Sequence, residues 1–179
     1  MAFFQGAAEH RVPPETREYI ELLQRRVKPG RVPEVFYALA EHPRLLKAWV
    51  EAQQAFIPIP NRFGAAQHIA GMLIAHARGC QACFSTSRAV LATLGFDDAA
   101  LDRLCESPGA LPLEERERRV VEFTLRIARD PGTLRAADFR ELEQAGFSRE
   151  EILEMIGVAA YWNLATTLAM AVDAGLREE

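Results

Sequence analysis

Two cysteines separated by two residues are the side chains of this sequence best suited to chemistry. Cys80 and Cys83 form a Cys-x-x-Cys pair directly after Gly79. If a helix begins at Cys80, the unpartnered amide N–H groups of its first turn stabilise a thiolate and lower the thiol pKa below its free value of about 8.5. Cys83 follows one turn later on the same face, so the two sulfurs can alternate between dithiol and disulfide. This spacing favours redox chemistry over a pair of inert core cysteines or a metal site.

Two histidines precede the cysteine pair on the same apolar segment. His76 lies four residues before Cys80, and His68 lies twelve residues before it. An imidazole close to a thiol can act as its base and can stabilise the thiolate, whereas elsewhere it would simply be hydrogen-bonded in the core or at the surface. The two histidines and two cysteines would suffice in number for zinc, but no second CxxC and no HxxxH accompanies them. We therefore expect no metal and no cofactor.

The elements that must position these side chains are helices. Apolar residues recur at helical spacing through nearly the whole chain, and no stretch alternates with a period of two. Gly79 is suited to a left-handed helix cap, and Ser148 with Glu151 fits a capping box. The predicted helices span Glu15 to Val27, Pro33 to Ala40, Pro43 to Phe56, Asn61 to Arg78, Cys80 to Gly95, Asp97 to Glu106, Pro112 to Arg129, Ala136 to Gln144 and Ser148 to Ala174. The sequence predicts an all-α, single-domain helical bundle over residues 1–179, with residues 1–12 mobile.

Composition narrows the classes of function. The 179 residues carry 21 Lys and Arg against 25 Asp and Glu, a net charge of −4, which gives no electrostatic case for binding nucleic acid or an anionic membrane. Uninterrupted apolar runs reach only seven residues, as at Ile69 to Ala75, and the first ten residues do not resemble a signal peptide. Three cysteines do not form an even disulfide framework. We expect a soluble, cytoplasmic protein.

The arrangement of these motifs resembles the AhpD-like alkylhydroperoxidases of the carboxymuconolactone decarboxylase superfamily. The likeness covers Pro33 to Gly175 and includes the apolar helix, the Gly-Cys-x-x-Cys pair and a following helix that ends in Leu94-Gly95-Phe96. It continues through Pro112-Leu113-Glu114-Glu115-Arg116, Phe139 to Gly146 and Ile152 to Asn163, and Val32-Pro33 with His42-Pro43 is similar to the peroxidase-related branch. The resemblance implies an all-helical homo-oligomer that reduces hydroperoxides without haem or metal. Its CxxC dithiol would be recycled by a protein or lipoyl dithiol donor.

The family's motif has a Glu twelve residues before the first Cys and a His four residues after the second. Here those positions hold His68 and Ser87, and the family's Asn-Arg pair of the last helix corresponds to Thr166-Thr167. The proton relay has therefore changed. His68 could serve as the base if it reaches Cys83 directly or through a water, and Ser87 could hold that water. By resemblance, Cys83 is the protected sulfur that attacks the peroxide, and the more exposed Cys80 resolves the sulfenic acid.

Two other functions fit the same sequence. A lactone decarboxylase-like enzyme would use His68 or His76 as a base for proton abstraction and would not need its cysteines. A catalytically inactive, oligomeric binding module would have lost its chemistry together with the family's relay residues. The reactivity of the two thiols separates these alternatives from the redox function.

Overall fold

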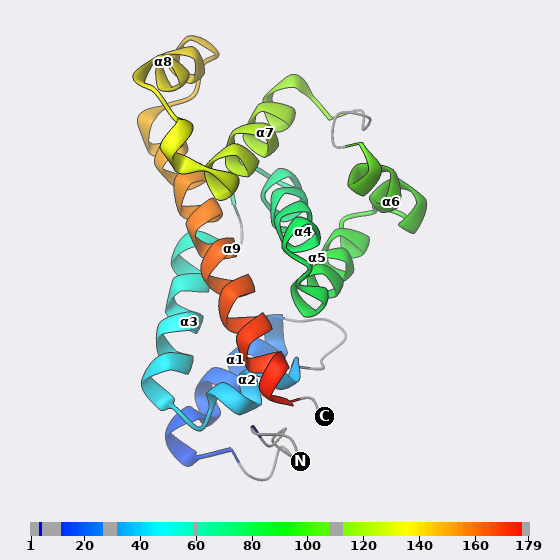
Figure 1. The fold of residues 1–179 in the computed structure, drawn as a ribbon, viewed down its shortest axis with the longest axis vertical. Coiled ribbons are helices and arrows are strands. Elements are labelled where there is room, and N and C mark those ends of the chain that lie inside the picture. Colours follow the sequence, from blue (N-terminus) through cyan, green and yellow to red (C-terminus); the bar gives the residue numbers. More distant parts are fainter. Residues whose placement is uncertain (1–3, 5–11, 27–31, 59–60, 108–112, 177–179) are drawn as a thin grey trace.

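The computed structural model describes residues 4, 12–26, 32–58, 61–107 and 113–176, and these residues form helices joined by short loops (Figure 1). The predicted mobility of the N-terminus falls almost entirely on residues outside these ranges, except that Val12 is buried in the core. The α-helices are α1 (Arg17–Arg26), α2 (Glu34–Leu39), α3 (Pro43–Phe56), α4 (Ala66–Arg78), α5 (Gln81–Thr93), α6 (Asp98–Glu106), α7 (Glu115–Arg129), α8 (Ala136–Gln144) and α9 (Arg149–Leu176). Two 3-10 turns, η2 (Pro14–Thr16) and η3 (Pro131–Thr133), complete the described elements. The predicted all-α class is confirmed.

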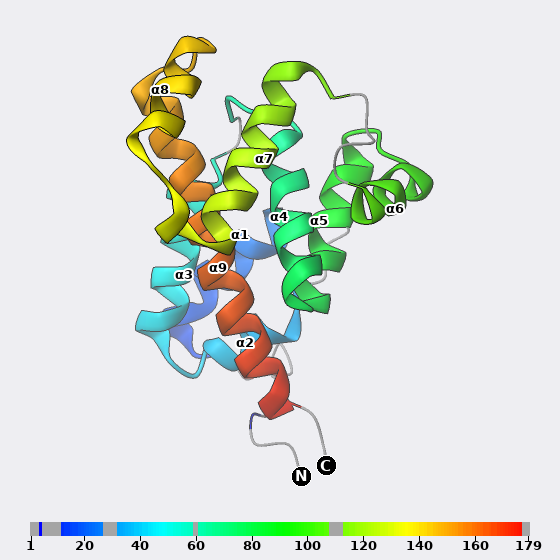
Figure 2. The same cartoon turned by 45° about the horizontal axis from the view of Figure 1, so that its top comes forward.

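Helices α4 and α9 hold the bundle together. Helix α9 packs against α7, α4 and α3, while α4 packs against α5 and α7 (Figures 1 and 2). Ten successive residues of α4, from Ala66 to Ala75, are buried, as in a helix that neighbours cover on all sides. One apolar cluster joins α1–α3 to the second half of α9, and a second joins α4–α7 to its first half. The two cysteines belong to the first cluster.

Local sequence signals fix most helix ends. Helices α3 and α8 have the predicted bounds, Gly79 adopts the left-handed conformation with a φ of 74°, and Ser148 and Glu151 form the predicted reciprocal capping bonds. Helix α4 begins at Ala66 rather than Asn61, because Asn61 Oδ1 accepts a hydrogen bond from the Phe63 amide and holds a turn instead.

Helix α9 is long and apolar enough to cross a membrane by length and composition alone. Over half of its apolar stretch, 56%, is nevertheless buried inside the protein, where α9 packs mainly against α7, α4 and α3. Its hydropathy is that of a core helix, and α9 is not a membrane span. The predicted helix, Ser148 to Ala174, agrees with α9, and polar residues such as Asn163 and Thr166 are the reason that its uninterrupted apolar runs are short.

A glycine on α4 makes room for a tryptophan side chain of α9. A Cβ added at Gly71 would lie 2.0 Å from Cε2 of Trp162, so alanine there requires the buried indole to move. We expect Gly71→Ala to lower the free energy of unfolding by about 1–3 kcal/mol despite alanine's higher helix propensity. Urea denaturation monitored by circular dichroism measures this change.

The matched control is Gly157→Ala on α9. Its new Cβ would approach Cδ1 of Phe56 at 2.6 Å, but the Phe56 side chain is 43% exposed and can swing outward. This variant should lose clearly less stability than Gly71→Ala. Equal losses, or a stabilised Gly71→Ala variant, would show that the α4–α9 approach is not tightly packed.

Candidate active site at the start of α5

The turn between α4 and α5 places both sulfurs at one helix N-terminus. Gly79 ends α4 in the left-handed conformation, and the Cys80 amide donates to the Ala75 carbonyl at 2.9 Å. Cys80 is then the N-cap residue of α5, and Cys83 lies in its first turn. Both cysteines are free thiols. The structure therefore brings the CxxC pair to the helix start that the sequence predicted.

The pKa values of the two thiols shift in opposite directions, because the Cys83 thiol stabilises the thiolate of Cys80. A hydrogen bond from Cys83, together with the Cys83 backbone amide and against the effect of burial, lowers the pKa of Cys80 to about 7. The contact with Cys80, followed by burial, raises the pKa of Cys83. The Cys80 side chain does not form a fully aligned capping hydrogen bond, so the amide acts on it mainly through its dipole. Near neutral pH the pair therefore releases one proton, chiefly from Cys80.

The expected difference in exposure between the cysteines is wrong. Cys80 is 2% exposed and Cys83 is 8% exposed, so Cys80 is not the more accessible of the two. Side chains of the α1–α3 and α9 cluster cover both residues. In an isolated helix the N-cap position is open to solvent. Here side chains of the surrounding apolar cluster pack over it. A substrate must reach the sulfurs through a local opening of this cover.

His68 is buried on α4, 8% exposed, and burial lowers the pKa of its imidazole. It is therefore a neutral ring at pH 7, as a general base requires. Its ring Nε2 lies 3.4 Å from Nε2 of Gln67. Among the described residues it makes no hydrogen bond to a cysteine sulfur or to Ser87, so a direct His68–Cys83 contact is not formed in this conformation.

Ser87 and His76 occupy different environments. Ser87 lies one turn after Cys83 on α5, and its Oγ is buried without a hydrogen-bond partner among the described residues. Such an orphaned hydroxyl has room in its hydrogen bonding for a water or a substrate oxygen. His76 is exposed and its ring contacts Phe84, with centroids 5.4 Å apart.

Within the described ranges, no group of three or more His, Cys, Asp and Glu side chains is placed to hold a metal, so the four residues of the zinc alternative do not form a metal site.

Arg78 is a residue that the sequence reasoning missed. Its Nη2 donates to Thr167 Oγ1 at 2.9 Å and its Nη1 contacts Asn163 Oδ1 at 3.4 Å. Asn163 is itself oriented by donating to the Ala128 carbonyl at 3.0 Å. This guanidinium lies close enough to Cys80 to lower its pKa, while the Asp173 carboxylate raises it. Only the tertiary contact between α4 and α9 reveals this, because Arg78 read along the chain is an ordinary helix-terminal cation.

The two threonines of the predicted Thr166-Thr167 pair make different hydrogen bonds. Thr166 Oγ1 donates to the Trp162 carbonyl within α9, at 2.7 Å. Thr167 accepts the Arg78 hydrogen bond. An arginine from α4 thus lies beside α9.

Comparison with known proteins places the fold. No protein-family model matches the sequence, and no curated protein matches it. An uncharacterised peroxidase-related protein from Ralstonia eutropha JMP134, described as an alkylhydroperoxidase AhpD core, is similar in structure with a TM-score of 0.83 and 20% identity, over 99% of this chain and 92% of that one. A peroxidase-related protein from Silicibacter sp. TM1040 has a TM-score of 0.80 and 22% identity, over 95% and 87% of the two chains.

A third similar structure carries a different activity in its description. It is the debrominase Bmp8, determined as a cysteine-to-alanine variant with 2,3,4-tribromopyrrole, with a TM-score of 0.79 and 16% identity over 97% of this chain and 90% of that one. The three matches span nearly the whole chain. The chain therefore has the AhpD-like all-α fold that its sequence resemblance predicted.

Proposed function

We propose that this protein is a thiol-dependent hydroperoxide reductase that cycles Cys80 and Cys83 between dithiol and disulfide. The observation that carries the proposal is the pairing of the two cysteines at the start of α5, where Cys83 and its amide lower the pKa of Cys80 to about 7. A thiolate populated at neutral pH is what peroxide reduction requires. The peroxidase-related descriptions of two structural neighbours support the same class of chemistry.

The reaction balances with the two thiols and one proton relay. The Cys80 thiolate attacks the outer oxygen of the hydroperoxide, the O–O bond breaks, and the alkoxide takes a proton to leave as an alcohol. The sulfenic acid on Cys80 is then attacked by the Cys83 sulfur, which forms the S–S bond and breaks the S–O bond. The departing hydroxide leaves as water by taking up the proton that Cys80 released to solvent when it ionised. A dithiol donor, from a protein or a lipoyl group, reduces the disulfide and is itself oxidised.

The order of attack differs from the one that the family resemblance implies. That resemblance assigns the attack to Cys83, but burial and the contact with Cys80 raise the pKa of Cys83. Cys80 is also the N-cap residue of α5, with the Cys83 thiol and amide directed at its sulfur, so we assign the attacking thiolate to Cys80 and the resolving thiol to Cys83.

The proton relay is proposed to run through residues that differ from the family's. His68 is neutral because burial lowers its pKa, and Ser87 offers a buried, unpartnered hydroxyl one turn beyond Cys83. Together they could accept the Cys83 proton and pass it to the departing alkoxide through a bound water. His76 is exposed and contacts Phe84, so we give it no part in this relay.

The proposed setting is a homo-oligomer in the cytoplasm that binds neither nucleic acid nor membrane. Exposed apolar side chains along α9, Leu153, Leu164 and Met170, favour association with a second copy. The reducing cytoplasm would keep the pair in its dithiol form between turnovers.

Reductive debromination is the second candidate function. The neighbour described with tribromopyrrole shares this fold, and a dithiol can supply the two electrons that replace a carbon–bromine bond by carbon–hydrogen with release of bromide. The non-redox alternatives from the sequence, a His68- or His76-dependent lactone decarboxylase and an inert binding module, predict function without either thiol. Turnover of a brominated pyrrole, but of no hydroperoxide, by the reduced protein would favour this second candidate.

Peroxide treatment of cysteine variants tests the proposed reaction. One equivalent of cumene hydroperoxide should convert Cys80 and Cys83 of the wild type to a disulfide, with one equivalent of alcohol released. Cys83→Ser should accumulate a sulfenic acid on Cys80, trapped with dimedone and located by mass spectrometry. A sulfenic acid on Cys83 in the Cys80→Ser variant, with none in Cys83→Ser, would restore the order implied by the family. Activity that survives Cys80→Ser/Cys83→Ser would refute the redox function.

The acidity of Cys80 is tested by alkylation as a function of pH. Since the thiolate is the reactive form, the rate should be low well below pH 7, rise through a midpoint near 7 and level off above it. Cys83→Ala removes the stabilising hydrogen bond and should move this midpoint upward. Cys83→Ser keeps a hydroxyl donor and should move it less. Identical midpoints in the two variants would show that the side chain of residue 83 does not stabilise the thiolate.

The charge of Arg78 is tested with two alkylating agents of similar size. A cation beside Cys80 attracts negatively charged iodoacetate but not neutral iodoacetamide. Arg78→Met should lower the iodoacetate-to-iodoacetamide rate ratio by about threefold or more, and Arg78→Lys should keep most of it. Thr167→Val, which removes the acceptor that holds the guanidinium, should give an intermediate ratio. An unchanged ratio in Arg78→Met would remove Arg78 from the site.

A further inference from the structure

A cavity of about 290 Å³ lies between the end of α3, the loop before α4 and the first turns of α9. Its walls are mainly apolar and include Phe56, Phe63, Leu153 and Val158. Leu153 is 66% exposed and Phe56 43% exposed, so large apolar side chains border the opening. A small concave site with apolar walls and few polar groups is the usual form of a small-molecule binding site.

The polar group deepest in this cavity is the amide of Gln67. Gln67 is only 1% exposed, yet it contributes to the cavity lining, and its Nε2 lies 3.4 Å from Nε2 of His68. An amide nitrogen only donates, so His68 Nε2 accepts this bond and its proton resides on Nδ1. The lone pair that would make His68 a base is therefore engaged by Gln67.

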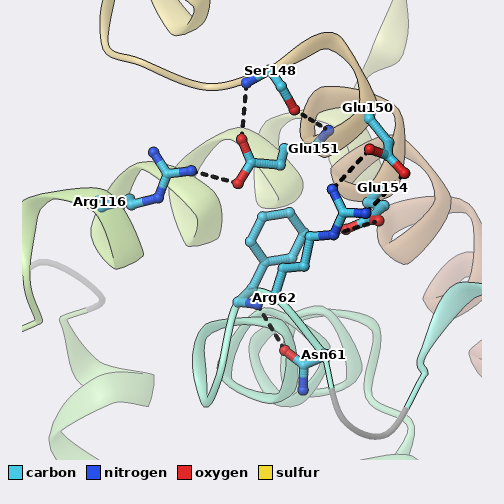
Figure 3. Close-up of polar contacts among 8 residues, drawn as sticks. Asn61, Arg62, Arg116, Ser148, Glu150, Glu151 and Glu154 are labelled. Carbon is cyan, nitrogen blue, oxygen red and sulfur yellow. Dashed lines mark hydrogen bonds and ion pairs between the residues drawn. The ribbon is translucent and has the colours of Figure 1, made fainter.

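Charges at the rim of the cavity select against anions. Arg62, in the loop before α4, donates to both carboxylate oxygens of Glu150 at 2.8 and 2.9 Å and contacts Glu154 at 3.4 Å (Figure 3). These contacts tie the loop to the start of α9 (Figure 3). Two carboxylates, Glu150 and Glu154, line the cavity beside this one guanidinium, which leaves the rim with an excess negative charge. The nearby Glu151 is occupied separately by Arg116 and by the Ser148 amide.

We propose that this cavity binds a small, uncharged and largely apolar molecule through one hydroxyl or hydroperoxyl group that hydrogen-bonds to Gln67. Because the same amide contacts His68, a molecule that hydrogen-bonds to Gln67 also changes the environment of His68 Nε2. An organic hydroperoxide and its product alcohol both have this chemistry. The inference deepens the proposed function, on which the role of His68 as a base rests. Binding itself does not require reactive cysteines.

Binding is tested on the full-length Cys80→Ser/Cys83→Ser variant, which cannot turn over a peroxide. The probes are 2-phenyl-2-propanol, which is uncharged, and benzoate, which is an anion of similar size. Calorimetry should show saturable binding of the alcohol, and benzoate should bind at least about tenfold more weakly because of the acidic rim. The ¹⁵N shift of the His68 Nε2, assigned by its loss in His68→Asn, should move as the alcohol binds.

Two tryptophan variants in the same background show where the probe binds. Ala55 is exposed and lines the cavity, so Ala55→Trp should fill it and reduce alcohol affinity by at least about tenfold. Gln54→Trp adds the same bulk at the neighbouring exposed position, outside the cavity lining, and should bind like the parent. Gln67→Leu should keep the cavity but weaken binding and abolish the His68 shift. Equal binding by the two tryptophan variants, or no binding by the parent, would overturn the proposal.

The outcomes separate this inference from the proposed function. If the wild type forms no disulfide with a hydroperoxide while the alcohol binds as described, the cavity stands as a ligand site and the peroxidase proposal fails. If the disulfide forms but Ala55→Trp leaves alcohol binding unchanged, the peroxidase proposal stands and the cavity assignment fails.

Discussion

A left-handed glycine between two helices is the constraint on which the site depends. Gly79 ends α4 and allows α5 to begin one residue later, which makes Cys80 an N-cap residue and places Cys83 in the first turn. Only then can one sulfur stabilise the negative charge of the other, with help from the amide of the first turn. If α4 continued through this point, the same two cysteines would be ordinary residues within one helix. The low pKa of Cys80 is thus a consequence of this backbone geometry.

The surrounding fold determines how deeply the two cysteines are buried and which charges lie near them. Helix α9 contributes to both apolar clusters, orients Arg78 through Asn163 and Thr167, and helps to cover the cysteines. The side chains that cover the cysteines exclude solvent from the Cys80 thiolate and so raise its free energy. The positive charge of Arg78 stabilises this thiolate, whereas the negative charge of Asp173 destabilises it. The acidity of Cys80 therefore results from a local hydrogen bond that outweighs burial, with long-range charges making smaller adjustments.

Local signals in the sequence predicted much of this arrangement. Proline, glycine and capping residues determine helix ends through backbone dihedrals and nearby hydrogen bonds, and for that reason the bounds of α3 and α8 and the Gly79 cap could be predicted. The CxxC placement followed from the same reasoning. The exposure of the cysteines could not be predicted, because it depends on which helices pack over the N-cap. Cys80 was expected to be exposed, but it is buried. The partnership of Arg78 with α9 and of Gln67 with His68 likewise depends on side-chain packing, which periodicity does not describe.

The proposed peroxide reduction requires the two sulfurs to act as one redox unit. A crystal structure of the protein after stoichiometric treatment with an organic hydroperoxide tests this most directly. The proposed cycle predicts a Cys80–Cys83 disulfide at the start of α5, with the Gly79 turn retained. Cys105, the third cysteine, which lies on α6, should remain a free thiol. Two unmodified thiols beneath an intact cover, or oxidation confined to Cys105, would contradict it.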